Sequence, residues 1–320
     1  MKNLIFCFDG TSKEPEDAAQ KVTSSGGIQD SNISNILKLH LLFGGDLKDG
    51  NRHNLPQLSL YYSGVGTYGS KIKRIFNAGL ALKDPGRIIN EALDDLNNHY
   101  VKGDNIFVFG FSRGAALARK FASVYKSEEK TRWIKANIKF MGVFDTVSSI
   151  GMPDFNTDEE HLSDVKFLNR TVSSHVNEVL HLCSIDDKRK VFQPTLINAE
   201  DKVTEIWFAG AHSDVGGGYH RDGLSDNTLQ YMLDELERRK LNIKTLAPSE
   251  VLYDELKADI DDIDLDFDDL IIEPNIFGKN HQQSRSWLIS VLTLYDRNVC
   301  VIKNDKVTRQ RPKIHHSVAE

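Results

Sequence analysis

Six short, mostly apolar segments recur along the chain, and small or polar residues that favour a turn follow each one. The segments are residues 4–8, 58–62, 106–109, 140–144, 179–183 and 205–208. Most are continuous apolar runs without polar alternation, which is typical of strands covered on both faces of a parallel sheet. Because parallel neighbours need a long crossover between them, the pattern predicts helices in the polar stretches that separate the segments.

Two of those polar stretches carry helical signals. Pro85 lies near the start of one, and apolar residues then recur at helical spacing from Ile88 to Leu96. Residues 115–125 indicate a second helix. The sequence therefore predicts an α/β fold, in which helices flank a mostly parallel central sheet.

No repeat or proline-rich linker divides the chain, so we expect a single domain over residues 1–320. Its core would occupy about residues 3–220. Helical insertions are expected around 151–178 and 220–300, and the residues from about 221 to 320 would form a helical C-terminal region.

Two stretches are expected to be peripheral. Residues 12–31 are polar and rich in serine, glycine and charge, which predicts a loop. Residues 254–270 are densely acidic but lack the spacing of a calcium-binding loop. This composition favours a solvated acidic face over a calcium site.

The charge balance argues against some classes of partner. The chain has 40 Lys and Arg residues and 46 Asp and Glu residues, which gives a net charge of -6. Broad nucleic-acid binding needs a cationic surface, so no nucleic-acid partner is expected. The acidic balance also gives no electrostatic attraction toward an anionic membrane.

The cysteines and the N-terminus bear on the compartment. Cys7, Cys183 and Cys300 are odd in number and form no CxxC pair, which predicts buried reduced thiols. The first apolar run is short and lacks a small-residue cleavage site, and no apolar stretch is long enough to span a bilayer. We therefore expect a cytoplasmic protein, or one exported by a secretion system that uses no signal peptide.

A serine between two glycines lies where a predicted strand ends and a predicted helix begins. The stretch GFSRG at residues 110–114 follows the segment at 106–109 and precedes two alanines. A sharp strand-to-helix turn needs small residues on both sides of the serine, and it places the hydroxyl at the helix N-terminus. In this context the pattern favours a nucleophilic Ser112 over a structural turn.

A serine hydroxyl becomes a strong nucleophile only when a base removes its proton. His212 follows the last strand-like segment in a glycine-rich loop, where an α/β fold would place a base. His315 and His316 are rival bases, but an exposed tail near the C-terminus explains them equally well. The sequence therefore favours His212.

The base in turn needs a carboxylate that orients it. Asp145 follows the segment at 140–144 directly, and Asp186 and Asp187 follow the next segment as alternatives. The order Ser112, Asp145, His212 matches the chain order of an α/β-hydrolase triad.

An oxyanion hole would require two backbone N–H groups. The first is that of Arg113, directly after the serine. In the standard strand order of an α/β-hydrolase, residues 4–8 would be the third strand, whose loop usually donates the second N–H. Gly10 and Thr11 are therefore the expected donors, and the loop at 64–67 is the next candidate.

Asp9 and Asp214 are further candidate binding residues beside these loops. Asp214 is expected to bond loop amides rather than to orient the base. The GVG stretch at 64–66 is too short for a dinucleotide fingerprint, and a GxxxxGK[ST] pattern is absent from the sequence. We expect neither a metal nor a cofactor.

These segments together resemble a known family. The stretches that carry the likeness are FDGT at 8–11, GVGT at 64–67, GFSRGA at 110–115, GVFDTV at 142–147, DDKR at 186–189, FQP at 192–194 and WFAGAHSDVGGGY at 207–219. They are similar to the uncharacterised α/β-hydrolase-like domain of the type VI secretion lipase effectors, the first class of those phospholipases. The likeness extends in order over about residues 3–220.

The resemblance implies hydrolysis of esters in glycerophospholipids, of the phospholipase A kind, with transient contact to a membrane surface. It carries the family's triad to Ser112, Asp145 and His212, the residues chosen above from their spacing. An esterase that acts on soluble acyl or sugar esters is one alternative. A hydrolase-like binding module without catalysis is the other.

Overall fold

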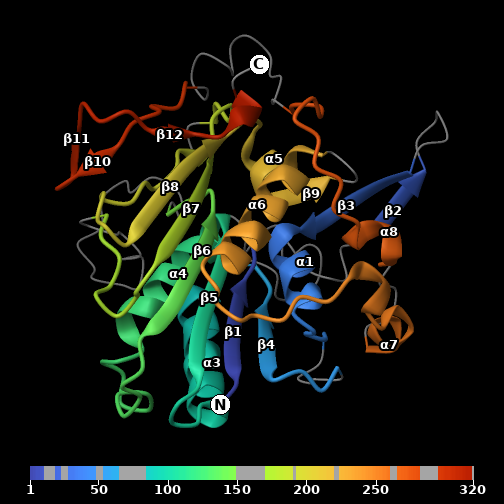
Figure 1. Ribbon diagram of the computed structural model, residues 1–320, viewed down its shortest axis with the longest axis vertical. Helices are drawn as coiled ribbons and strands as arrows, with labels where there is room; N and C mark the ends of the chain where they lie inside the picture. The colour runs from blue at the N-terminus through green and yellow to red at the C-terminus, as the bar shows by residue number, and fades with distance from the viewer. Residues whose placement is uncertain are drawn as a thin grey trace.

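The computed structural model describes most of the chain (Figure 1). The described residues are 1–10, 19–22, 28–47, 53–64, 84–148, 170–189, 192–219, 223–259, 265–281 and 295–318. Thr11, the loop residues 65–67 and the expected insertion up to residue 169 lie outside these ranges.

A seven-stranded sheet forms the centre of the molecule. Its strand order is β12-β8-β7-β6-β5-β1-β4, and every neighbouring pair is parallel. The strands are β1 (Asn3–Phe8), β4 (Gln57–Tyr62), β5 (Asn105–Phe111), β6 (Ile138–Phe144), β7 (Val179–Ser184), β8 (Val203–Phe208) and β12 (Lys313–Ile314). The first six coincide with the six predicted segments, which confirms the α/β fold with a parallel sheet.

Helices cover both faces of this sheet (Figure 1). They are α1 (Asn35–Leu42), α3 (Asp84–His99), α4 (Ser112–Val124) and α6 (Leu224–Arg238). Phe6 of β1 packs in a cluster with side chains of α3 and α4, whereas its neighbour Cys7 packs in a cluster with side chains of α1 and α6. Burial on both faces explains why the strand segments are continuously apolar.

The strand register brings the carboxyl ends of the strands to one edge of the sheet. Phe8 at the end of β1 pairs with Gly110 of β5, and Phe111 at the end of β5 pairs with Phe144 of β6. The residues that follow these strands therefore begin along the same edge, which is where open parallel sheets place their ligands.

A second, antiparallel sheet joins the two ends of the family-like region. It has the order β2-β3-β9 and contains β2 (Ala19–Val22), β3 (Ile28–Ser34) and β9 (Gly217–Tyr219). The expectation of a loop over residues 12–31 is therefore wrong for residues 19–22 and 28–31. Pairing of β3 with β9, about 190 residues away, gives this polar stretch a strand conformation that its own composition does not predict.

The C-terminal region contributes helices and then short strands. It contains α6, η3 (Pro248–Glu250), α7 (Tyr253–Asp259), α8 (Phe267–Leu270), β10 (Ile302–Lys303), β11 (Lys306–Val307), β12 and η4 (His316–Val318). Leu256, Leu265 and Leu270 of the acidic stretch are buried in a cluster with Leu37 and Leu41 of α1, while Asp254 and Glu255 are exposed. Apolar anchors thus hold this stretch. Its described acidic groups are mostly at the surface, but Asp269 is buried beside Leu270. Within the described ranges no helix combines the length and apolarity needed to cross a bilayer.

Candidate active site

The serine turn has the geometry that its glycines suggested. Ser112 ends the path of β5 and begins α4 with a φ of 57°, in the left-handed region. A Cβ atom on Gly110 would lie 2.7 Å from the Cα of Ala115, and one on Gly114 would overlap the carbonyl oxygens of Phe8 and Asp9. Only glycine fits at these two positions, so the sequence GFSRG is the local requirement of this turn.

Three predicted residues from three strand ends form a continuous hydrogen-bonded chain. Nε2 of His212 lies 2.8 Å from Oγ of Ser112, and its Nδ1 lies 2.5 Å from Oδ2 of Asp145. Asp145 directly follows β6, and His212 begins the short helix α5 (His212–Gly216) after β8. All three side chains are buried. The structure therefore brings together Ser112, Asp145 and His212.

The alternative acids contact other groups. Oδ2 of Asp187 accepts the backbone N–H of His212 at 3.2 Å rather than its ring. Oδ2 of Asp186 accepts the N–H of Gly210 and the side-chain amide of Asn280. Both carboxylates fix the backbone around the histidine, and Asp145 is the one that meets its imidazole.

The rival bases near the C-terminus have their own partners. The ring of His315 stacks on Phe208 with centroids 4.2 Å apart, and its Nδ1 lies 3.0 Å from Oγ of Ser317. The ring of His316 packs on that of His315. It is His212 whose ring nitrogen meets Ser112.

Sequence reasoning missed an arginine that pairs with Asp145. Nη1 of Arg297 donates to Oδ1 of Asp145 at 2.6 Å, and Nη2 donates to Oδ2 at 2.9 Å. The side chains of both residues are fully buried. Arg297 follows Asp145 by 152 positions and belongs to no motif, so no spacing in the sequence could have identified it.

Burial and charge set the protonation states of the pair. Burial alone would raise the pKa of Asp145, but the charge of Arg297 and the hydrogen bond from His212 outweigh it and hold the pKa well below its usual value. Burial lowers the pKa of His212, and Asp145 only partly compensates. The rings of Phe111 and Phe192 lie 4.6 and 4.8 Å from the imidazole, centroid to centroid, and exclude water from it. Near neutral pH the site therefore pairs an ionised carboxylate with a neutral imidazole.

The candidate oxyanion loop lies beside the serine. A Cβ atom on Gly10 would lie 3.5 Å from the Cβ of Ser112. In this structure the N–H of Gly10 donates to Oδ1 of Asp9 at 2.6 Å, so Gly10 could bind an oxyanion only after that bond is released. Asp9 also accepts bonds from the hydroxyls of Ser34 and Tyr61, both at 2.6 Å. Asp9 thus fixes the loop that approaches the nucleophile.

Asp214 organises the histidine loop. Its Oδ2 accepts the N–H groups of Ala211 at 2.8 Å and of His281 at 2.9 Å. Its Oδ1 lies 2.6 Å from Nδ1 of His281. Asp214 therefore bonds loop amides, as its sequence context suggested, and ties α5 to the C-terminal region.

A group of metal-ligating residue types occurs on β7 and β8. Ligand atoms of His181, Cys183 and Glu205 lie within 4.8 Å of one another. Nε2 of His181 accepts the N–H of Thr146 at 3.1 Å, and Nδ1 bonds Oε2 of Glu205 at 2.9 Å. Both ring nitrogens are thus engaged, and the ring supports Thr146, the residue after Asp145.

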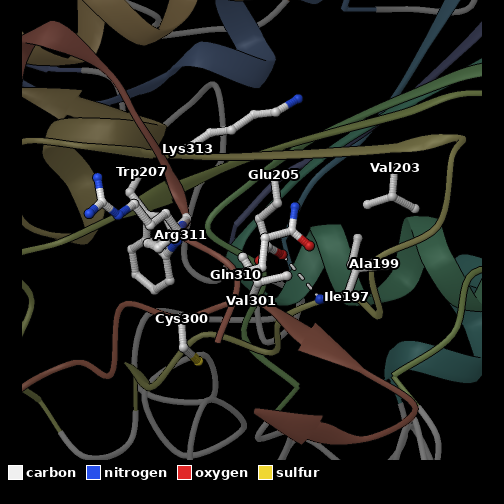
Figure 2. Close-up of a pocket in the computed structure, with 11 residues that line it drawn as sticks. Ile197, Ala199, Val203, Glu205, Trp207, Cys300, Val301, Gln310, Arg311 and Lys313 are labelled. Atoms are coloured by element: carbon white, nitrogen blue, oxygen red, sulfur yellow. Dashed lines mark hydrogen bonds between the residues drawn. The ribbon is translucent and has the colours of Figure 1, made fainter. Parts of the chain in front are cut away.

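Figure 2 shows a pocket on the face of β8 that carries Glu205 and Trp207. Cys300 and the segment from Gln310 to Lys313 close its other side. Its volume of about 60 Å³ has room for only a few water molecules. The lining contains none of the residues Ser112, Asp145 and His212, so this pocket is separate from the candidate active site.

Comparisons with known proteins show which family the chain is similar to. A family model described as "T6SS, Phospholipase effector Tle1-like, catalytic domain" matches residues 2–127 and 123–235. A curated relative, the uncharacterised protein YEL023C of Saccharomyces cerevisiae, is 27% identical over 248 residues, covering 60% of this chain and 32% of the yeast protein.

Two solved structures are also similar to this chain. An uncharacterised protein from Pseudomonas aeruginosa has a TM-score of 0.44 at 18% identity, covering 73% of this chain and 45% of that chain. The Tle1 effector bound to the VgrG spike of the type 6 secretion system has a TM-score of 0.43 at 23% identity, covering 68% of this chain and 51% of that chain. The chain thus spans about a third to a half of the length of these relatives. Because the family model matches more than half of it, the chain belongs to the Tle1-like family of type VI secretion phospholipase effector catalytic domains.

Proposed function

We propose that the protein is a serine hydrolase that cleaves carboxylic ester bonds of glycerophospholipids, as a phospholipase A does. The observation that carries the proposal is the continuous, buried hydrogen-bonded chain from Ser112 through His212 to Asp145. Membership of a phospholipase effector family supports a lipid substrate.

In the proposed first step, Oγ of Ser112 attacks the ester carbonyl carbon while Nε2 of His212 takes the hydroxyl proton. The tetrahedral intermediate collapses, and the leaving alcohol receives that proton from His212. A water molecule then attacks the acyl-enzyme carbonyl while His212 takes its proton, and His212 returns that proton to Oγ of Ser112 as the fatty acid leaves. Asp145 keeps the Nδ1–H of His212 in place and stabilises the imidazolium that forms in each step. The side chains of Ser112, His212 and Asp145, together with water, account for the bond changes and proton transfers of these steps.

The charge that develops on the carbonyl oxygen needs donors. The N–H of Arg113, in the first turn of α4, is the first proposed donor, and the helix N-terminus adds its dipole. The loop of Gly10 and Thr11 is proposed to supply the second. The side chain of Arg113 is partly buried, and burial lowers its pKa to about 10. It stays cationic at neutral pH and is available to a lipid phosphate.

A bilayer substrate requires transient contact between the protein and a membrane surface. As part of the same proposal, the protein reaches that surface by export through a secretion system that uses no signal peptide, as its family membership suggests.

The test is release of fatty acid and lysophospholipid from mixed phospholipid vesicles, followed by mass spectrometry. We expect Ser112→Ala to lower turnover by at least about 10⁴-fold while its circular dichroism stays unchanged. Ser123→Ala is the matched control, because Ser123 lies exposed on the same helix and bonds only the carbonyl of Lys120 among the contacts described. It should retain full activity.

Equal release by wild type and Ser112→Ala would overturn the proposed role of the serine. Cleavage of short soluble esters without phospholipid release would move the substrate class to soluble esters. If no ester is cleaved and a fluorophosphonate probe fails to label Ser112, a binding module without catalysis would replace the proposal.

A further inference from the structure

We propose that Arg297 is a positioning residue of the active site, which clamps Asp145 and the loop after β7 around His212. The residue lies in the C-terminal region, beyond residue 235, where the match to the family's catalytic domain ends. The expected effect of Arg297 on ester cleavage rests on the proposed function. Its role in holding Asp145 and the loop rests on its contacts alone.

Every N–H of the Arg297 guanidinium has an acceptor. Besides its two bonds to Asp145, Nη1 donates to the carbonyl of Ser184 at 2.8 Å and Nη2 to that of Phe192 at 2.6 Å. Nε donates to the carbonyl of Asp187 at 2.9 Å. A guanidinium has five N–H groups in a fixed planar fork, and this site uses all of them. A lysine, with three donors on one nitrogen, could not reproduce the arrangement.

The groups that Arg297 holds surround the imidazole of His212. Asp145 accepts from one ring nitrogen. The Phe192 ring packs edge-on against the imidazole, and the Asp187 carboxylate accepts the backbone N–H of His212. One side chain therefore fixes the acid and the loop that determine where the base sits.

The segment that carries Arg297 is anchored to the same loop. The N–H of Tyr295 donates to the carbonyl of Lys188 at 2.6 Å, and the side-chain amide of Gln193 donates to the carbonyl of Tyr295 at 3.1 Å. The side chains of Lys188 and Asp296 form an ion pair at 3.0 Å. Residues 295–297 thus lie along the loop, and the C-terminal region completes the site.

The charge of Arg297 has a consequence for the base. Asp145 and Asp187 attract a proton to His212, while Arg297 repels it, and Arg189 pairs with Asp187 and offsets part of its charge. Loss of the Arg297 charge should therefore raise the pKa of His212. A substitution of Arg297 that loses its packing but keeps its positive charge should leave the pKa of His212 unchanged.

The test compares Arg297→Gln, which removes the charge and most of the fork, with Arg297→Lys, which keeps the charge. Arg239→Gln is the matched control. Arg239 is largely buried and bonds two carboxylates, those of Glu178 and Glu235. Glu178 precedes β7, so this pair lies at the opposite edge of the sheet from the site. The readouts are kcat/KM against pH on the ester that wild type cleaves, and an NMR titration of the His212 ring.

We expect Arg297→Gln to lower kcat/KM by about 10–100-fold, by analogy with the effect of losing a group that orients a metal-ligating side chain. In this variant the acid limb of the kcat/KM profile should move to higher pH, and the pKa of His212 measured by NMR should rise. Arg297→Lys should lose kcat by a similar factor while the His212 pKa stays near that of wild type. Arg239→Gln should change neither readout.

An Arg297→Lys variant with wild-type kcat would overturn the inference, and so would a folded Arg297→Gln variant whose His212 pKa matches wild type. If wild type cleaves no ester, the proposed function fails while the NMR titration still decides the role of Arg297. If Arg297→Gln does not fold, the kcat of Arg297→Lys decides it.

Discussion

Two residues of the candidate site hold backbone conformations that side chains rarely adopt. Ser112 has a φ of 57° and Asp145 a φ of 38°. Such a conformation costs on the order of 1–3 kcal/mol and persists only when its surroundings impose it. The N–H of Val147 bonds the carbonyl of Ser112 at 3.1 Å, and the N–H of Asp145 bonds that of Leu182 at 2.7 Å. These bonds and the buried strands fix both residues, and the strain therefore points to selection for the site rather than for stability.

The Asp145 carboxylate keeps its neighbour His212 in the tautomer that can accept a proton at Nε2. Asp145→Asn should therefore lower kcat by about 10⁴-fold, the effect of the same change in a serine protease triad. Because the lost charge favoured the imidazolium, the pKa of His212 should also fall. In wild type that pKa is already below 6.5, so the acid limb of kcat/KM should lie below pH 6.5 and move lower still in the variant.

The measurement is the pH profile of kcat/KM for both proteins, with the remaining activity of Asp145→Asn followed at high enzyme concentration. The shift is opposite in sign to the one expected for Arg297→Gln. An acid limb that moves to higher pH in Asp145→Asn would contradict this account of the pair.

At the scale of elements, α5 is held between two sheets. It begins after β8 of the central sheet and leads directly into β9, which pairs with β3. Asn35 at the start of α1 reinforces this connection, because its side-chain amide donates to the carbonyls of Val215 and Ser225, both at 3.0 Å. The position of His212 therefore depends on how closely β9 approaches β3.

Gly217 tests that dependence. A Cβ atom there would lie 2.5 Å from the backbone nitrogen of Asn35, and its φ is 83°. Gly217→Ala should force β9 away from β3, lowering the free energy of unfolding and kcat together. Gly103→Ala is the control, because Gly103 also has a positive φ, 107°, but open space around it. We expect Gly217→Ala to cost about 1–3 kcal/mol more than the control in urea unfolding. Equal costs and an unchanged kcat would show that the strand contact does not position the histidine.

The same elements separate what the sequence could predict from what it could not. Each central strand is buried on both faces, so a run of a few consecutive apolar residues is enough to predict it. The serine turn can be predicted because Gly110 and Gly114 flank Ser112. The pairing of β3 with β9 and the clamp of Arg297 on Asp145 both join residues far apart in the chain. No local pattern encodes such contacts, and in the sequence Arg297 cannot be distinguished from a surface arginine.

At the scale of the whole molecule, segments from most of the chain converge on one edge of the sheet. The loop after β1, the start of α4, the end of β6 and the start of α5 meet there, and the C-terminal region adds Arg297. Buried charge also joins elements elsewhere: Lys38 of α1 bonds Asp226 of α6 at 3.1 Å with both side chains nearly inaccessible. Buried titratable groups whose pKa the fold shifts make its stability depend on pH as well as on its apolar core.

His40 of α1 is the clearest case. It is buried, its Nε2–H donates to the carbonyl of Asp46 at 2.7 Å, and its Nδ1 lies 2.9 Å from the hydroxyl of Ser59. Burial lowers its pKa to about 4 from an ordinary value of 6.5. Between about pH 6.5 and pH 4, His40 is mostly protonated in the unfolded chain and mostly neutral in the folded chain. The contribution of His40 to stability is therefore complete above pH 6.5 and is lost as the pH falls toward 4, by up to about 3 kcal/mol.

Urea unfolding of wild type and His40→Gln at pH 7 and at pH 4.5 measures this contribution. The glutamine can still donate toward the Asp46 carbonyl but does not titrate in this range. Titration of other buried groups, such as His212, lowers the stability of both proteins equally on acidification. The difference between the two proteins therefore isolates the contribution of His40. We expect the variant to be less stable at pH 7 because it packs less well, and to lose less stability on acidification. An equal loss in both proteins would show that His40 binds a proton as readily in the folded chain as in the unfolded chain. Water would then have to reach the ring between α1 and β4, which would contradict its burial.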